Sequence, residues 1–364
     1  MKTFYERLGI KRYINAHDTY TIYGGSRISK ESMLAMEEAS KHFTDIFEMQ
    51  RVLGEKIAEM THNEGAFITN GAAGGLKLAA AVCMVEGSDY LYSQLPDTKG
   101  AKNEIIVIRS QRNVYDVAIR GAGATIVEIG NADRTSPYEL EGKINEKTAA
   151  VFYFLASIYA KSALPLKEVI EIAHKKGVPV VVDAAAQLPP VENLWELTAM
   201  GVDLAIFSGG KTLCGPQDSG LILGKKSFIR DCIKFGAPVN GICRDSKTSR
   251  EAMAGLFVAL EQYLLLDQQA EYTRLEKMAL RLGEVFEEIG LEAKLVPHGP
   301  VGQIYPRIFG KCLGEGQALE ITAAMKEQRI YIGCDPLENS IFISPLNLNE
   351  CELEQVEQAL RRAI

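Results

Sequence analysis

The chain has 364 residues, of which 47% are hydrophobic and 24% charged, and its formal net charge is −7. It is too apolar for a disordered chain, it has no apolar run of the roughly 18 residues that a membrane helix needs, and its negative charge does not favour a nucleic-acid partner. A single hydrophobic core stops growing at about 250–300 residues, so we expect two domains.

The N-terminal segment, residues 1–12, is charged and lacks the apolar core of a signal peptide, so we expect a cytoplasmic protein. Residues 1–45 are predicted to form an arm followed by a helix that begins after Ser29. This predicted arm and helix precede the first strong strand signal of the chain.

From residue 46 to about 250, short apolar runs alternate with helical stretches. The runs predict strands at 66–69, 104–109, 124–129, 149–155, 178–182, 204–208 and 220–223. The clearest helices are predicted at 76–85 and 166–176. Near-continuous apolar strands separated by helices indicate an α/β fold with a mostly parallel sheet that is covered on both faces.

After about residue 248 the pattern changes to that of a smaller α+β domain. A long helical stretch is predicted up to about residue 289, and short strands are predicted at 293–296, 304–309, 330–332 and 341–344. A helix over 352–364 closes the chain. We therefore predict three segments: an arm with a helix (1–45), a large domain (46–250) and a small C-terminal domain (251–364).

The seven cysteines are scattered along the chain. Their number is odd and no pair has CxxC spacing, so the sequence predicts reduced thiols and neither a disulfide framework nor a metal site.

The first segment with candidate chemistry is the glycine-rich turn at residues 69–75, between a predicted strand and a predicted helix. Glycines allow the backbone to approach a ligand closely, and the helix that follows offers free N–H groups to a phosphate. Asn70, Gly71, Ala72 and Ala73 are the candidate contacts. A plain glycine-rich turn without a ligand is the alternative.

The second candidate is Asp183, at the carboxyl end of the predicted strand 178–182, where α/β sheets bind their ligands. A carboxylate there can pair with a protonated ring nitrogen. Ala185 is small enough for a flat ring to lie against the backbone. The alternative is that Asp183 caps a helix.

The third candidate is Lys211, in the segment Ser208-Gly209-Gly210-Lys211 after the predicted strand 204–208. A lysine kept near apolar surface loses its proton more easily and can form an imine. Ser208 can donate to a phosphate. The alternative for Lys211 is a surface lysine on a mobile loop.

Taken together, a phosphate loop, an aspartate and a lysine 28 residues later follow the order typical of pyridoxal-5'-phosphate (PLP) enzymes with the aminotransferase fold. Each element falls at the carboxyl end of a predicted strand, so one pocket would gather all three. The sequence therefore predicts PLP as the cofactor.

Further motifs extend this resemblance over nearly the whole chain. They are Ile14-Asn15-Ala16, Asn70-Gly71-Ala72-Ala73-Gly74, Val182-Asp183-Ala184-Ala185, Ser208-Gly209-Gly210-Lys211 running into Gly215-Pro216-Gln217, and Gly241-Ile242-Cys243-Arg244 with Lys247. With them the chain resembles the fold type I PLP enzymes of the branch that contains bacterial selenocysteine synthase and D-glucosaminate-6-phosphate ammonia-lyase. The implied fold is a seven-stranded-type sheet between helices, the large domain of PLP-dependent transferases.

The resemblance also implies roles for individual residues. Lys211 would hold the cofactor as a Schiff base, Asp183 would pair with the ring nitrogen, and Ser208 with the loop 71–74 would bind the phosphate. Arg244 and Lys247 would bind anionic groups of substrate or cofactor at the interface of a homodimer or larger homo-oligomer. The alternative for these two is a solvated basic stretch.

The resemblance assigns Arg307 to the substrate carboxylate, for which a guanidinium fork is suited. A salt-bridged surface arginine is the alternative. The chain departs from its relatives where many of them place a histidine over the cofactor ring. Gln111 or Arg112 would stack there instead. His17 and Asp18 either line the pocket or form a local turn.

The resemblance implies a PLP-dependent lyase of the ammonia-lyase type, acting on a small anionic amino acid or amino-sugar acid, with D-glucosaminate 6-phosphate as the best single candidate. An amino-acid racemase and a transferase that acts on aminoacyl-tRNA are the alternatives. The negative charge disfavours the last. So does the short segment before Asn15, which leaves no room for the N-terminal tRNA-binding domain of such synthases. We expect no membrane partner.

Overall fold

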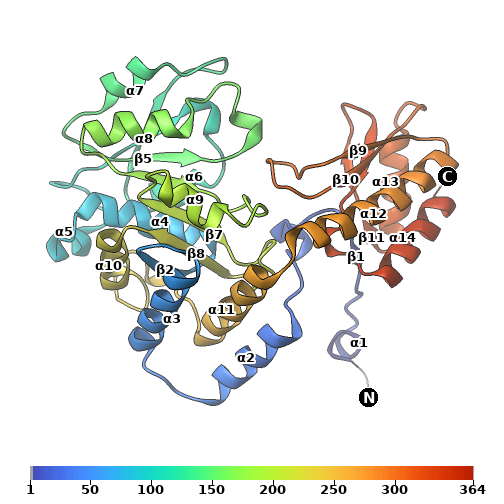
Figure 1. Ribbon diagram of the computed structural model, residues 1–364, viewed down its shortest axis with the longest axis horizontal. Helices are drawn as coiled ribbons and strands as arrows, with labels where there is room; N and C mark the ends of the chain where they lie inside the picture. The colour runs from blue at the N-terminus through green and yellow to red at the C-terminus, as the bar shows by residue number, and fades with distance from the viewer. Residues whose placement is uncertain (1–2, 364) are drawn as a thin grey trace. The chain divides into compact units, whose positions relative to one another are not determined.

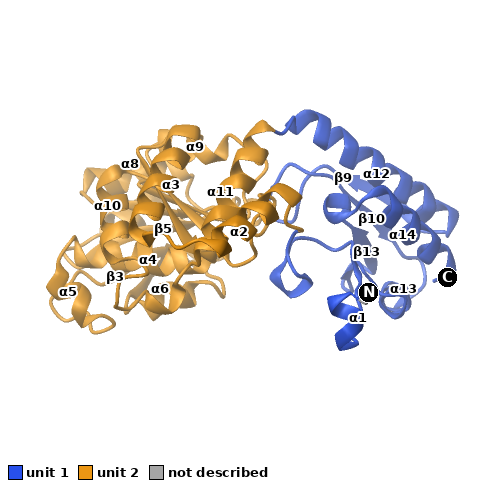
Figure 2. Cartoon of the chain, turned by 90° about the horizontal axis from the view of Figure 1, so that it is seen from below, with its two compact units in different colours: residues 1–26, 266–364 blue, residues 27–265 orange. Residues whose placement is uncertain are grey.

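The computed structural model describes residues 3–363, which form two compact units. Figure 2 colours the larger unit, residues 27–265, orange, and the smaller unit, residues 1–26 with 266–364, blue. This division differs from the predicted one at both boundaries. Helices α2 (Lys30–Lys41) and α11 (Arg250–Leu265) both belong to the larger unit, because they pack against each other.

The larger unit is built on a seven-stranded sheet with the order β2-β8-β7-β6-β5-β3-β4. The strands are β2 (Gly65–Asn70), β3 (Glu104–Ile108), β4 (Thr125–Ile129), β5 (Thr148–Phe154), β6 (Val180–Asp183), β7 (Leu204–Ser208) and β8 (Ser219–Gly224). Strands β3 to β7 pair in parallel, and β8 is antiparallel to both of its neighbours. The predicted mostly parallel α/β fold is confirmed.

Helices flank this sheet (Figure 1). Besides α2 and α11 they are α3 (Ile46–Met60), α4 (Gly71–Val85), α5 (Asp89–Gln94), α6 (Asp116–Gly121), α7 (Pro137–Lys143), α8 (Leu166–Lys175), α9 (Asn193–Ala199) and α10 (Lys226–Phe235). Successive residues of β6 enter different hydrophobic clusters: Val180 and Val182 join one, and Val181 joins the other. Because strand side chains alternate between faces, a strand covered on both sides is apolar throughout.

The smaller unit contains an antiparallel sheet with the order β12-β13-β10-β9 and a separate parallel pair, β1 with β11. The strands are β1 (Ile14–Asn15), β9 (Glu292–Val296), β10 (Arg307–Lys311), β11 (Ile330–Tyr331), β12 (Gly333–Asp335) and β13 (Ser340–Ile343). The helices are α1 (Phe4–Leu8), α12 (Gln268–Glu288), α13 (Gln317–Glu327) and α14 (Glu350–Arg362). The predicted α+β character is confirmed, and the N-terminal arm contributes one of its strands.

Several predicted elements differ from the structure, and two of the differences have a clear local cause. The helical stretch expected up to residue 289 is two helices, because the Asp267 carboxylate accepts hydrogen bonds from Gln269 N and Ala270 N and so starts α12 anew. The strand expected at 304–309 begins only at Arg307, directly after Pro306, which has no N–H to donate to a sheet. Within residues 3–363, no helix is both long and apolar enough to cross a membrane.

Candidate active site

The carboxyl ends of β6 and β7 bring two of the predicted site residues together. The two strands are parallel neighbours, and Asp183 at the end of β6 is paired with Ile206 of β7. Lys211 follows three residues after the end of β7 at Ser208. Burial raises the pKa of the Asp183 carboxyl, while the Ala185 N–H and the charge of Lys211 act in the opposite direction. The lysine is therefore close enough to act on the aspartate electrostatically.

Asp183 is half-buried, and within residues 3–363 only its Oδ1 accepts a hydrogen bond, of 2.9 Å from Ala185 N. It forms no ion pair within residues 3–363. The next helix, α9, begins only at Asn193, so Asp183 caps no helix. A partly buried carboxylate with an unused oxygen and a raised pKa is stabilised when it meets a cationic donor.

The Lys211 loop is held in place by backbone contacts that require glycine. A Cβ at Gly209 would lie 2.1 Å from Ser219 Oγ, and one at Gly210 would lie 2.5 Å from Gln217 Cα. Gly209 N donates to Ser219 O at 2.9 Å. Lys211 itself is half-buried, which is not the environment of a lysine on a mobile surface loop.

The predicted phosphate loop is itself helical, because α4 begins at Gly71 rather than near residue 76. Gly71 has a φ of +64°, in the region that favours glycine. The side chain of Asn70 does not cap α4 and instead donates from Nδ2 to Lys247 O at 3.2 Å. The first N–H groups of a helix of 15 residues are thus left without a side-chain cap, as a phosphate site requires.

Arg244 and Lys247 belong to a segment that packs against the start of α4. Lys77 of α4 forms an ion pair of 2.8 Å with Asp245, and a Cβ at Gly74 would lie 3.3 Å from Ser246 Cβ. Arg244 and Lys247 are exposed and form no ion pair among the described residues. The structure therefore places two cations without carboxylate partners beside the phosphate loop.

The two candidates for stacking on a ring have different environments. The guanidinium of Arg112 forms ion pairs with Asp116 and Glu128, which hold it against α6 and β4. Gln111 is completely buried, and its Oε1 accepts from Phe154 N at 3.1 Å. Its Nε2 has no partner in the part of the chain that the structure describes. Among the described residues, the ion pairs thus fix the guanidinium of Arg112, whereas Gln111 keeps a buried amide nitrogen without a partner.

Arg307 lies in the smaller unit, at the start of β10, and is only 8% exposed. Its Nε donates to His298 O at 3.1 Å, and its guanidinium lies over the rings of Phe309 and Phe342, 5.1 and 5.4 Å from their centroids. It forms no ion pair within residues 3–363, so it is not a salt-bridged surface arginine. A buried guanidinium without a carboxylate partner favours an anionic ligand.

Comparison with known proteins identifies the family of the chain. Residues 47–297 match the family model described as SelA, L-seryl-tRNA selenium transferase. The chain is 35% identical over 264 residues to a D-glucosaminate-6-phosphate ammonia lyase of Salmonella typhimurium, a match that covers 71% of the chain and 69% of the relative. The chain belongs to the L-seryl-tRNA selenium transferase family. The predicted resemblance is confirmed.

Other members of this family differ in how much of their length the chain spans. A 5'-C-glycyluridine monooxygenase-decarboxylase from a Streptomyces species is 31% identical, with 77% of the chain and 71% of the relative covered. An L-seryl-tRNA(Sec) selenium transferase of Aquifex aeolicus is 26% identical, with 70% and 58% covered. A solved structure of a D-glucosaminate-6-phosphate ammonia-lyase superposes with a TM-score of 0.87 at 29% identity over 100% of the chain and 98% of that structure.

Three residues outside the predicted set also stand out. The hydroxyl of Ser110, next to Gln111, is covered and has no partner among residues 3–363. Burial raises the pKa of Tyr159, and the charge of Asp183 adds to this effect. Tyr305 donates to both oxygens of Asp18 at 3.0 Å. Nothing in the local sequence marks these residues: the partners of Tyr159 and Tyr305 are distant in the chain, and the burial of Ser110 depends on the fold.

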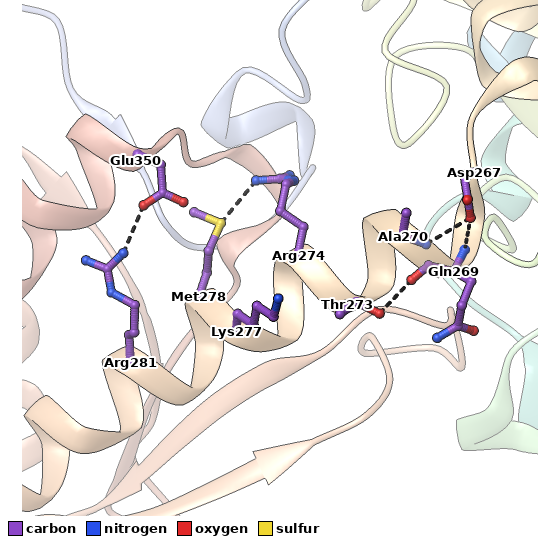
Figure 3. Close-up of a pocket in the computed structure, with 9 residues that line it drawn as sticks. All are labelled: Asp267, Gln269, Ala270, Thr273, Arg274, Lys277, Met278, Arg281 and Glu350. Carbon is purple, nitrogen blue, oxygen red and sulfur yellow. Dashed lines mark hydrogen bonds and ion pairs between the residues drawn. The ribbon is translucent and has the colours of Figure 1, made fainter.

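A separate cavity of about 700 Å³ lies along α12 in the smaller unit (Figure 3). Three of its lining residues are basic: Arg274, Lys277 and Arg281. Arg274 is paired with Glu271, and Arg281 with Glu350 and Glu357. None of the predicted site residues lines this cavity. Two of its three basic side chains are already paired with carboxylates.

Proposed function

We propose that the protein is a PLP-dependent lyase of the ammonia-lyase type that acts on a small anionic amino acid or amino-sugar acid, with D-glucosaminate 6-phosphate as the leading candidate. The observation that carries the proposal is the arrangement of Asp183 and Lys211 at neighbouring strand ends. It occurs in a chain that superposes over its whole length on a D-glucosaminate-6-phosphate ammonia-lyase.

The residues present fit PLP. Asp183 offers an unused carboxylate oxygen for a protonated ring nitrogen, and Ala185 has a short side chain. The uncapped start of α4 and the hydroxyl of Ser208 suit the phosphate. When bound, PLP supplies a carbonyl that condenses with amines and a ring that takes up electrons from the substrate α-carbon.

Lys211 has two tasks in this proposal. Its amine would hold the cofactor through the cofactor carbonyl, and its Nζ would take the proton from the substrate α-carbon. Asp183 remains ionised beside its cationic partner. The substrate would lose its β-hydroxyl together with a proton as one molecule of water. Hydrolysis of the resulting imine by another water would then release ammonia and leave a 2-keto acid.

The remaining cations would bind the two ends of the substrate. Arg307 suits the carboxylate, because it is buried and unpaired within the described chain. Arg244 and Lys247, beside the start of α4, suit a phosphate. Gln111 remains our candidate for contact with the cofactor ring, and Arg112 has the weaker claim because its ion pairs occupy it.

The proposal is tested by incubating the PLP-loaded protein with D-glucosaminate 6-phosphate and measuring ammonia and 2-keto acid. We expect the two products in equal amounts. Their absence with this substrate and with a panel of small anionic amino acids would contradict the lyase proposal. Inversion of the α-carbon without ammonia would indicate a racemase.

A second candidate comes from the relative named as a monooxygenase-decarboxylase, which is 31% identical. A protein of that kind would consume oxygen and release carbon dioxide from a glycyl nucleoside. An oxygen electrode distinguishes this candidate from the lyase, which needs no oxygen. A transferase acting on aminoacyl-tRNA is less supported, because the Aquifex relative is 26% identical to the chain whereas the ammonia lyase is 35% identical.

We also propose that the protein forms a homodimer or larger homo-oligomer. Several apolar side chains in the N-terminal part of the chain are exposed: Phe4 by 59%, Leu8 by 55%, Phe43 by 97% and Phe47 by 51%. Burying such residues against a second copy would remove apolar surface from water. Sedimentation that shows an active species of 40.0 kDa would contradict this proposal.

A further inference from the structure

The arm residues 15–18 are fixed in the smaller unit by hydrogen bonds. Asn15 Nδ2 donates to Asp18 O at 2.7 Å, and Asn15 Oδ1 accepts from His17 N at 3.0 Å. The Asp18 carboxylate, 2% exposed, accepts from Thr19 N at 2.6 Å and from the Tyr305 hydroxyl. The turn at His17 and Asp18 is thus anchored to the segment that leads into β10.

The imidazole of His17 packs against two aromatic rings. It stacks on Tyr23 at a centroid distance of 4.2 Å and meets Phe342 edge-on at 5.0 Å. Its Nδ1 is covered and has no hydrogen-bond partner among residues 3–363. Because Nδ1 is covered by protein, Nε2 is the ring nitrogen left to contact a ligand.

The protonation state of this ring follows from its surroundings. Burial lowers the pKa of His17 to about 4, and the charge of Arg307 adds to the effect. The imidazole is therefore neutral near pH 7 and carries one N–H. An N–H at the covered Nδ1 would be buried without an acceptor, which is unfavourable, so the hydrogen belongs on Nε2.

Arg307 and His17 converge on the same aromatic ring. The guanidinium lies 5.4 Å from the centroid of Phe342, and the His17 ring meets that same phenyl ring. Tyr305, two residues before Arg307, is bonded to the neighbour of His17, Asp18. The charge of Arg307 also acts on His17, so a charged donor and a neutral donor lie near each other in the smaller unit. The Asp18 carboxylate acts on Arg307 electrostatically, but within the described residues neither donor forms an ion pair with it.

We propose that His17 is a specificity-determining residue that donates from Nε2 to the substrate carboxylate that Arg307 binds. This inference rests on the proposed function, because it requires a substrate with a carboxylate. An amino acid would have its carboxylate held by a guanidinium and an imidazole N–H together. An amine of the same shape without a carboxylate would gain nothing from His17.

The test compares two probes that lack the reactive amine and differ only at the recognised group. D-gluconate 6-phosphate carries the carboxylate, and D-glucitol 6-phosphate carries a hydroxymethyl group in its place. Their dissociation constants are measured by calorimetry with the full-length, PLP-loaded protein. His17→Phe keeps the ring between Tyr23 and Phe342 but removes the nitrogens, and His17→Gln restores an N–H near the position of Nε2. His42→Phe is the matched control, since His42 is exposed at the end of α2.

A hydrogen bond to a charged group is strong enough to change affinity by about tenfold or more. His17→Phe should therefore weaken D-gluconate 6-phosphate by about tenfold or more and change D-glucitol 6-phosphate by less than about twofold. His17→Gln should recover most of the loss, and His42→Phe should change neither constant. An equal effect of His17→Phe on both probes, or none on either, would overturn the proposal.

This outcome is independent of the lyase assay. If the wild-type protein releases no ammonia from D-glucosaminate 6-phosphate but His17→Phe still weakens only the carboxylate probe, the proposed function fails and the inference stands. If ammonia is released and the Michaelis constant is unchanged in His17→Phe, the inference fails and the proposed function stands. Failure of the wild-type protein to bind D-gluconate 6-phosphate at millimolar concentration would overturn the inference, and ammonia release alone would then decide the proposed function.

Discussion

The substitution Gly220→Ala tests whether the phosphate site depends on the close approach of β8 to the start of α4. A Cβ at residue 220 would lie 2.4 Å from the carbonyl carbon of Gly71 and 2.6 Å from its oxygen. Carbon atoms in contact lie about 3.5–4.0 Å apart, so the backbone at Gly71 must move by about 1 Å. Thr69 Oγ1, which donates to Gly71 O at 2.8 Å, would be 2.7 Å from the new methyl group.

Such overpacking costs about 1–3 kcal/mol in the free energy of unfolding. A shift of about 1 Å also disrupts at least one hydrogen bond between the α4 N-terminus and the cofactor phosphate. A bond to a charged group contributes about 1.5–3 kcal/mol, so the dissociation constant for PLP should rise by about tenfold to 100-fold.

The assay is a PLP titration followed by absorbance, together with urea unfolding of the protein without cofactor. Gly142→Ala is the control, because a Cβ there meets nothing within 4 Å and the residue lies in helix α7. The control should bind PLP normally and be slightly more stable, since alanine favours a helix over glycine. A PLP affinity of Gly220→Ala within about twofold of wild type would refute the reasoning.

Three further predictions concern charges. Asp183→Asn should retain PLP but lose most of its activity, because a neutral amide stabilises a pyridinium poorly; unchanged turnover would argue against the role. Arg244→Ala and Lys247→Ala should raise the Michaelis constant for a phosphorylated substrate more than for its unphosphorylated analogue, by about tenfold to 100-fold, whereas Arg307→Ala should affect both alike. Changes within about twofold for all three would mark them as surface charges. Because the folded-state pKa of His17 is lowered to about 4, the unfolded chain takes up a proton there below about pH 6.5 while the folded chain does not. Between pH 7 and pH 5, the free energy of unfolding measured in urea should therefore fall by about 1 kcal/mol more in the wild type than in His17→Phe, with partial solvent screening included. Equal decreases in the two proteins would contradict this prediction.

The strands of the large sheet could be predicted because they are apolar on both faces. The side chains of Val180, Val181 and Val182 enter the hydrophobic clusters on both faces of the sheet, so the run is apolar throughout and is recognisable in the sequence. The candidate residues at strand ends could be predicted for the same reason, since Asp183 ends an apolar run and Lys211 follows another after two glycines. The antiparallel insertion of β8 between β2 and β7 depends on long-range pairing that a local pattern does not encode.

Other features depend on contacts between distant residues. The break between α11 and α12 could not be predicted, because the sequence on both sides of Asp267 has helical periodicity. The hydrogen bonds that the Asp267 carboxylate accepts show that a second helix begins there. Arg112 looked free to stack, but its partner Glu128 is 16 residues away on β4. His17 and Asp18 suggested a local turn, and their link to Tyr305, 287 residues beyond Asp18, was not visible in the sequence.

The central claim is that Lys211 binds PLP covalently, and it is tested most directly by reduction with borohydride. The full-length protein is incubated with PLP, reduced and digested, and the modified peptide is identified by mass spectrometry. The account predicts one phosphopyridoxyl group on Lys211 and none in Lys211→Ala. A modification on another lysine, or one that persists in Lys211→Ala, would contradict it.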